Sequence, residues 1–85
     1  MVYRIDITET AQKEIFKKLE PFLIERLDKR IKKLEDEPKI YGKPLKRPLI
    51  GIWEIRFEKR WRVWYKINDD QKLVEIVGFK HKDEM

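Results

Sequence analysis

The alternation of apolar and polar side chains between positions 53 and 67 constrains the fold of this chain more than any other feature. Its apolar members fall at every second position, namely Trp53, Ile55, Phe57, Trp61, Val63, Tyr65 and Ile67. A period of two is typical of β-strands with one buried face. The pattern is interrupted around Lys59, so the sequence predicts two strands joined by a short turn, preceded by a loop that begins before Pro44.

The polar side of this hairpin carries arginines and one aromatic residue. If the odd-numbered residues face the core, Arg56 and Arg62 emerge together on the open face of the sheet, and Trp64 lies beside them. Planar guanidinium groups suit phosphate oxygens, and a cationic face attracts phosphate-rich partners. The alternative is a solvated sheet face whose arginines pair with Glu54 or Glu58.

The segment before the hairpin predicts a strand followed by two helices. Residues Val2 to Ile7 alternate in polarity, and either Thr8 or Thr10 can cap the helix that follows. Glu20-Pro21 breaks that helix, because proline is accepted at the first turn of a new helix and the residue before it avoids the helical region. We expect the second helix to run to about Glu37. Its core-facing stripe is Leu23, Leu27, Ile31 and Leu34.

The rest of the chain predicts a loop, a turn and a last strand. Pro38 to Gly51 is rich in proline and glycine, which indicates a loop. The last strand is expected from Leu73 to Phe79, followed by a basic triplet, Lys80-His81-Lys82. An unbroken strand would place His81 on the same face of the sheet as Glu75. A bend or bulge at Gly78 would make this assignment invalid.

These elements predict a single domain over residues 1–85 of the α+β class. The order is β-α-α-β-β-β, with an N-terminal helical hairpin packed on one face of a small, mainly antiparallel sheet.

Composition narrows the possible functions. Lys and Arg number 21 against 16 Asp and Glu, a net charge of +5, which favours nucleic acid as partner. With no cysteine and one histidine, we expect no metal and no cofactor. No apolar run approaches the roughly 18 residues of a membrane span, so we expect a soluble, cytoplasmic protein without a membrane partner. A charged fraction of 44% with one Asn and two Gln is typical of proteins from hyperthermophiles.

The hairpin and the loop before it also carry a family resemblance. Its motifs are Pro44-Leu45-Lys46, Gly51, Trp53-Glu54-Ile55-Arg56 and Trp61-Arg62-Val63-Trp64-Tyr65. In these motifs, in element order and in length, the chain resembles the RelE/ParE superfamily of bacterial and archaeal type II toxins. The spacing from Pro44 to Tyr65 is similar to that of the YoeB branch.

The resemblance implies a toxin neutralised by a cognate antitoxin. RelE-like members cut messenger RNA in the ribosomal A site, where the RNA's own 2′-hydroxyl attacks the adjacent phosphate. Arg62 matches the arginine that these nucleases use at the phosphate, and Arg56 matches a basic residue on the preceding strand. Lys80, His81 and Lys82 fall in the C-terminal region that supplies further catalytic groups, and His81 is the candidate acid or base.

The chain departs from the RelE pattern at two places. Glu54 stands where RelE has a catalytic lysine, and no tyrosine follows His81. Glu54 is an alternative base on chemical grounds. Both departures favour a second interpretation, a ParE-like toxin that inhibits DNA gyrase, or an inactive relative that acts by binding only. A plain nucleic-acid-binding module is a third.

Further cations are candidates for binding RNA outside the reaction centre. They are Lys43, Lys46 and Arg47 in the loop and Arg60 in the hairpin turn, with Trp64 as a platform for a base. The alternative is that the loop residues only keep the surface soluble and that Trp64 is covered by the antitoxin.

Overall fold

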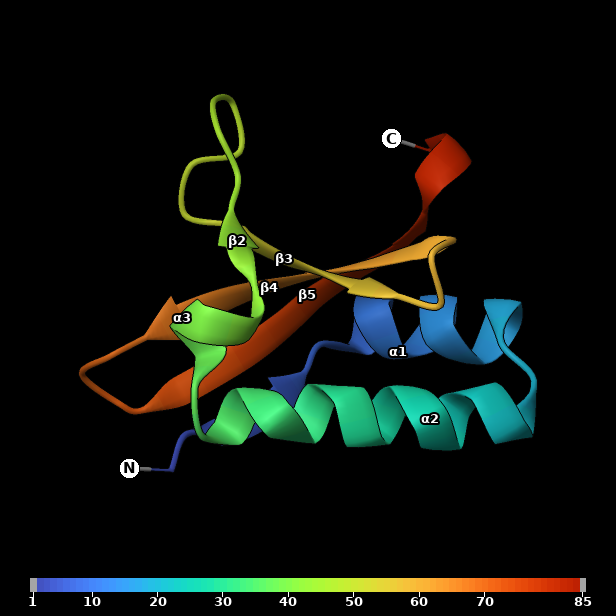
Figure 1. Cartoon of the computed structure of the whole chain (residues 1–85), viewed down its shortest axis with the longest axis horizontal. Coiled ribbons are helices and arrows are strands. Elements are labelled where there is room, and N and C mark those ends of the chain that lie inside the picture. Colours follow the sequence, from blue (N-terminus) through green and yellow to red (C-terminus); the bar gives the residue numbers. More distant parts are fainter. Residues whose placement is uncertain (1, 85) are drawn as a thin grey trace.

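The computed structural model describes residues 2–84, and within them one open five-stranded sheet is covered by helices on one side (Figure 1). The strands are β1 (Arg4–Ile7), β2 (Lys43–Pro44), β3 (Trp53–Phe57), β4 (Trp61–Asn68) and β5 (Leu73–His81). Their spatial order is β1-β5-β4-β3-β2, in which β1 is parallel to β5 and all other neighbours are antiparallel. The predicted α+β fold is therefore confirmed.

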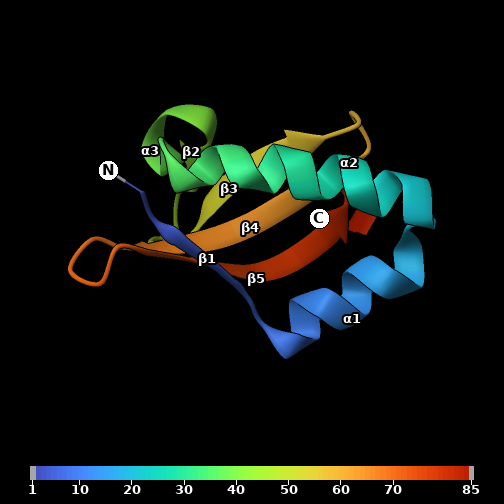
Figure 2. The same ribbon diagram turned by 90° about the horizontal axis from the view of Figure 1, so that it is seen from below.

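The helices form where the capping residues predict them. They are α1 (Glu9–Lys18), α2 (Pro21–Lys32) and the single turn α3 (Pro38–Tyr41). Thr8 is the residue that caps α1, because its Oγ1 accepts a hydrogen bond of 3.2 Å from the backbone N–H of Ala11. Figure 2 shows α2 running along the sheet while α1 lies beside β5. None of the helices in residues 2–84 is long and apolar enough to cross a membrane.

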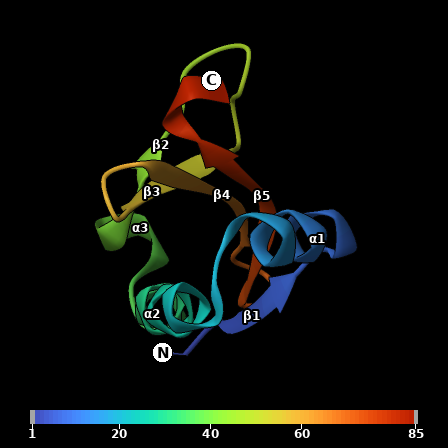
Figure 3. The same cartoon turned by 90° about the vertical axis from the view of Figure 1, so that its right-hand side faces the viewer.

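The core lies between the sheet and the two long helices (Figure 3). The sheet buries the odd-numbered residues of the hairpin, as the alternation predicts, with Val63 and Tyr65 at 0% exposure. Trp53 and Trp61 are half-buried and pack against the core. The helices contribute Ala11, Ile15, Leu19, Leu27, Ile31 and Leu34, all of which are buried. Burial of apolar surface of this kind is the main stabilising term in a small domain.

The first strand begins at Arg4 and not at Val2. Three further expected boundaries are wrong. First, α2 ends at Lys32, and Lys33–Glu35 continue as a 3₁₀ helix instead of α-helix to Glu37. The tighter turn keeps Leu34 buried, and it lets the carbonyl of Glu35 accept a 2.7 Å hydrogen bond from the backbone N–H of Tyr3. The 3₁₀ turn thus connects the end of the helix to the segment before β1.

Second, the segment Pro38 to Gly51 is not all loop, because it contains α3 and the two-residue strand β2. Pro38 occupies the first turn of α3, a position where its missing N–H costs nothing. Third, the last strand does not stop at Phe79 but runs on through Lys80 and His81, since β4 begins early enough to pair with both.

Candidate functional site

Three cations lie in one row across the open face of the sheet. The register pairs Arg56 on β3 with Arg62 on β4, and Arg62 in turn with Lys80 on β5. Neighbouring strands are about 4.8 Å apart, so the three Cα positions span roughly 10 Å. Arg56 is exposed, while the Arg62 side chain is only 15% exposed. Sequence parity predicts that the two arginines share this face, and the register confirms it.

A bulge in β5 brings Lys80 into this row. Trp64 pairs with Gly78, but the next residue, Tyr65, pairs with Ile76, so Val77 is an extra residue in β5. Because side chains alternate between the two faces of a sheet, one extra residue moves every later side chain of the strand to the opposite face. Lys80 therefore lies opposite Arg62, where an unbroken strand would have placed it on the core side.

His81 lies on the other face of the sheet from this row. It pairs with Trp61, and the two rings meet edge to face with centroids 4.9 Å apart. Its Nδ1 accepts a 3.2 Å hydrogen bond from the backbone N–H of Asp83. Lys82 is exposed in the 3₁₀ helix Lys82–Glu84, and its backbone N–H donates to the carbonyl of Arg60 at 2.8 Å. Of the basic triplet, the strand register brings only Lys80 opposite Arg62.

Glu54 is the centre of a polar cluster beside the row. Its Oε1 lies 3.5 Å from Nε of Arg62, and its Oε2 accepts a 3.0 Å hydrogen bond from the indole N–H of Trp64. Nη1 of Arg62 also donates to the carbonyls of Lys59, at 3.3 Å, and Trp61, at 3.1 Å. The guanidinium is thus held in one orientation by the hairpin turn and by Glu54.

Lys80 is anchored from the neighbouring helix. Its Nζ lies 2.9 Å from Oε2 of Glu14 on α1, and Glu14 also pairs with Lys18 at 3.7 Å. Strand β1 pairs only as far as Ile76, so the far end of β5 has a free edge along which α1 packs. Sequence reasoning missed Glu14. Its i, i+4 spacing to Lys18 indicates a surface pair, and only the fold brings it to the site.

The remaining predicted RNA-binding residues are spread around the open face. Lys43 on β2 lies opposite Glu54 and is exposed, so it extends the polar surface by one strand. Lys46 and Arg47 are exposed in the loop before β3, and Arg60 is exposed in the hairpin turn. Among the described residues, no hydrogen bond or ion pair joins these last three to the row.

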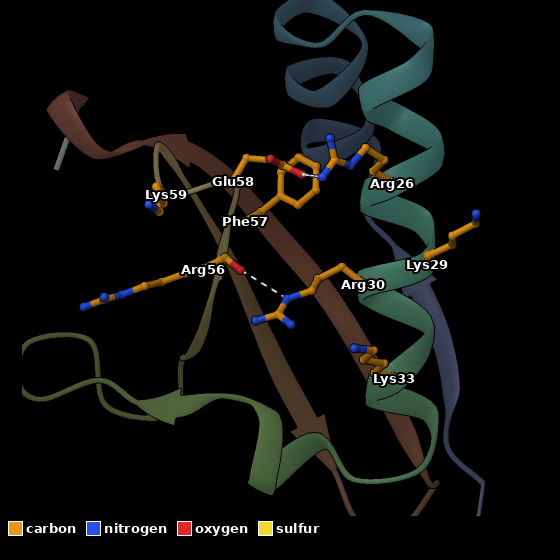
Figure 4. A pocket seen from close by; sticks show the side chains of 8 residues that line it. All are labelled: Arg26, Lys29, Arg30, Lys33, Arg56, Phe57, Glu58 and Lys59. Atoms are coloured by element: carbon orange, nitrogen blue, oxygen red, sulfur yellow. Dashed lines mark hydrogen bonds and ion pairs between the residues drawn. The ribbon is translucent and has the colours of Figure 1, made fainter.

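A second group of cations lines a cleft of about 580 Å³ between α2 and β3 (Figure 4). In the sequence, this part of α2 has the pattern of an ordinary charged helix surface. Positions 26, 30 and 33 are spaced at i, i+4 and i+7, a signal that all three lie on one helix face. Nothing in the sequence shows that this face looks toward β3.

Comparison with known proteins places this geometry in a family. Residues 5–85 match the family model for the ParE toxin of the type II toxin-antitoxin system parDE. Toxin RelG of Mycobacterium tuberculosis is 29% identical over 85 residues, which cover 100% of this chain and 97% of RelG.

Two solved structures agree in fold and sequence. A chain of the RelBE2 toxin-antitoxin complex of M. tuberculosis is 30% identical with a TM-score of 0.87, covering 96% of this chain and 100% of that one. A chain of the intact RelBE complex of E. coli is 25% identical with a TM-score of 0.76, covering 93% and 95%. With the family model spanning nearly its whole length, the chain belongs to the RelE/ParE superfamily of toxins from type II toxin-antitoxin systems.

Proposed function

We propose that this toxin inhibits translation by cutting messenger RNA on the ribosome. The observation that carries the proposal is the row of Arg56, Arg62 and Lys80 across three adjacent strands. Transfer of a phosphoryl group passes through a transition state with extra negative charge on the phosphate oxygens, and fixed cations stabilise that charge. Arginine adds a bidentate grip that orients the phosphate.

The proposed reaction uses the RNA's own 2′-hydroxyl as nucleophile. Glu54, beside Arg62, accepts the proton of that hydroxyl while its oxygen bonds to the adjacent phosphorus. The bond from phosphorus to the 5′-oxygen breaks, and that oxygen takes a proton from the ammonium of Lys80. The products are a cyclic 2′,3′-phosphate and a free 5′-hydroxyl, so no water or other reactant is consumed.

Arg62 and Arg56 supply the electrostatic part of this reaction. Arg62 is already held by Glu54 and by two carbonyls of the hairpin turn, which lowers the cost of orienting it at the phosphate. Among residues 2–84, no three histidine, aspartate or glutamate side chains gather as a metal site. The proposal assigns each proton transfer to a side chain on the open face.

The test is cleavage in a translating extract. Purified toxin is added, and the 5′ ends of the messenger RNA are mapped for the native chain and for Arg62→Ala. The expected result is cuts at fixed positions within codons that disappear in Arg62→Ala. Translation that continues unaffected by the native toxin would overturn the proposal.

A second candidate function is favoured by one observation. Glu54 neutralises Arg62 and also holds Trp64, which is the arrangement expected of a rigid binding surface. In that case the toxin acts by binding alone, and DNA gyrase is the candidate target for a ParE-like member. Arrest of DNA supercoiling by purified gyrase, with messenger RNA left intact, would support this function instead.

We also propose that an antitoxin covers the groove between α1 and α2. This groove of about 220 Å³ is lined mainly by apolar residues, including Ile24, Leu27 and Phe16, whose relative exposure is 67%. Two relatives were solved as toxin-antitoxin complexes, which supports a protein partner of that class. An amphipathic helix or extended segment with apolar anchors fits such a groove.

A further inference from the structure

The cleft between α2 and β3 is strongly positive. Six of its eight lining residues are lysine or arginine, and Glu58 is the one carboxylate among them. Oε1 of Glu58 is already paired with Nη2 of Arg26 at 2.9 Å. The remaining cations have no negative partner among the cleft residues.

The spacing of the cations along the helix directs three of them to the same side. Arg26, Arg30 and Lys33 follow one another at i, i+4 and i+7, so they lie on one face over roughly 10 Å of helix. Figure 4 shows all three pointing toward β3, whereas Lys29 points away. Lys59 of the hairpin turn also lines the cleft.

The floor of the cleft is the outer edge of β3. Strand β2 pairs only with Trp53 and Glu54, so the rest of this edge has no strand beside it. Nε of Arg30 donates a 3.3 Å hydrogen bond to the carbonyl of Arg56, so one backbone acceptor of this edge has a partner. Phe57 is 4% exposed, so it offers no apolar anchor to a ligand in the cleft.

The cleft continues the row on the open face. Across the sheet, the row runs from Lys80 on β5 through Arg62 on β4 to Arg56 on β3. The cleft begins at β3, because Arg56 also lines it. Arg56 joins the two regions, because its side chain points away onto the open face while its carbonyl lies in the cleft (Figure 4).

We infer that the cleft is a second binding site for the RNA backbone, which holds phosphates of the strand that passes over the edge of β3 from the cleavage site. The inference extends the RNA-binding surface of the proposed function. The cleft is lined by six cations, of which Arg26, Arg30 and Lys33 point toward β3, and it has no exposed apolar anchor. Such a site suits a polyanion, since protein partners usually bury an apolar or aromatic centre. Contacts to phosphates alone carry no base specificity, so the site should bind different sequences alike.

The test measures binding without cleavage. The probe is a single-stranded 2′-O-methyl RNA of about 12 nucleotides, within the usual site sizes of single-strand binders. Its 2′-oxygens carry methyl groups and cannot attack the phosphate. Binding is followed by fluorescence anisotropy at several salt concentrations for the native chain and for Lys33→Gln/Lys59→Gln.

A matched control removes the same charge elsewhere. Lys13→Gln/Lys17→Gln also lowers the net charge by two, but its two lysines are exposed on α1, outside the cleft. We expect the cleft variant to bind about tenfold more weakly at low salt, with a slope of log affinity against log salt that is shallower by about 1.4, or about 0.7 per lost phosphate contact. The control should change neither quantity by more than a small fraction of that.

A gain of affinity gives a second readout. Glu58→Gln removes the cleft's carboxylate and releases Arg26. It should bind the probe several-fold more tightly than the native chain. The inference would be overturned if the cleft variant and the control lost the same affinity for the probe. It would also be overturned if the cleft variant bound an acidic protein partner more weakly while its affinity for RNA stayed unchanged.

The binding test is independent of cleavage. If the native toxin leaves messenger RNA intact in a translating extract but the cleft variant still loses affinity for the probe, the proposed reaction fails and the RNA site stands. If messenger RNA is cut and the cleft variant binds the probe like the control, the reaction stands and the RNA site fails.

Discussion

At the scale of single residues, the orientation of Arg62 carries the proposed chemistry. Its guanidinium has three acceptors, from Glu54, Lys59 and Trp61, so its position on the open face is fixed before any ligand arrives. A lysine at this position keeps the charge but has no planar fork to satisfy the same acceptors. Comparing Arg62→Ala with Arg62→Lys therefore separates the effect of the charge on cleavage from the effect of its orientation.

Arg62→Ala should slow cleavage by about 100-fold or more, the usual effect of removing one group that stabilises the transition state. Arg62→Lys should fall between it and the native chain. The rate of messenger RNA cleavage in extract gives both values. Lys66→Ala, which removes a cation from the same face outside the row, is the control and should cut at nearly the native rate. Equal losses in Arg62→Ala and Lys66→Ala would show that general charge, and not the row, is responsible.

Gly42 and Tyr65 form a tight contact behind the open face. A Cβ at position 42 would overlap Oη of Tyr65, which donates a buried hydrogen bond to the carbonyl of Pro38. Gly42→Ala should therefore cost about 1–3 kcal/mol of unfolding free energy, as overpacking usually does. Urea denaturation measures this loss. In the background of Tyr65→Phe, which lacks the hydroxyl, the same substitution should cost clearly less; equal costs in both backgrounds would rule out the steric explanation.

The same hydroxyl makes stability depend on high pH. Burial raises the pKa of Tyr65 above its ordinary value. Above about pH 10 the unfolded chain loses this proton while the folded chain keeps it, so folding stability falls as the pH rises. Unfolding free energies at about pH 9 and about pH 11 should differ less in Tyr65→Phe than in the native chain. An unchanged difference in the variant would show that other groups set the alkaline loss.

At the scale of elements, the helical hairpin has two surfaces of different chemistry. The face of α2 toward β3 is cationic, whereas the groove it shares with α1 is apolar. The two surfaces predict separate partners, RNA for one and an antitoxin for the other.

Phe16→Glu should weaken binding of the antitoxin by at least about tenfold, because it places a charge at an apolar anchor of the groove. The measurement is titration calorimetry with the cognate antitoxin. Phe22→Glu changes a residue that is also exposed but does not line the groove, and it should bind nearly as the native chain does. If both variants bind equally well, the antitoxin lies elsewhere.

The elements also show how far the sequence determines the site. Alternation predicts the facing of Arg56 and Arg62 because both strands of the hairpin keep strict parity, and the register confirms it. Alternation alone does not place Lys80 on this face, because the bulge at Val77 adds one residue to β5. The neighbouring Gly78 indicates where the strand can bulge, but the sequence does not decide that it does. Alternation also misses Glu14 and the cleft, since both depend on how the helices pack against the sheet.

At the scale of the whole molecule, the stability of the fold depends on the apolar core and little on the surface charges. The core is apolar and buried, while many of the ion pairs join exposed side chains, as in Lys13 with Glu9 or Lys39 with Asp69. Exposed pairs contribute little and are screened by salt. By contrast, six cations line the cleft where we propose that RNA binds.

Salt should therefore affect binding and folding differently. Raising salt from about 50 mM to about 200 mM should weaken binding of the RNA probe steeply. The same change should alter the unfolding free energy by less than about 1 kcal/mol. Parallel anisotropy and urea titrations give the comparison. A large loss of stability over this range would mean that ion pairs contribute substantially to the fold.

The central claim is that the bulge in β5 gives the catalytic position to Lys80 and not to His81. The most direct measurement compares cleavage of messenger RNA in extract by Lys80→Ala and His81→Ala, with circular dichroism to confirm that both fold. We predict that Lys80→Ala loses most of its activity while His81→Ala, on the far face beside Trp61, retains most of it. Loss of cleavage in His81→Ala with activity preserved in Lys80→Ala would contradict this account.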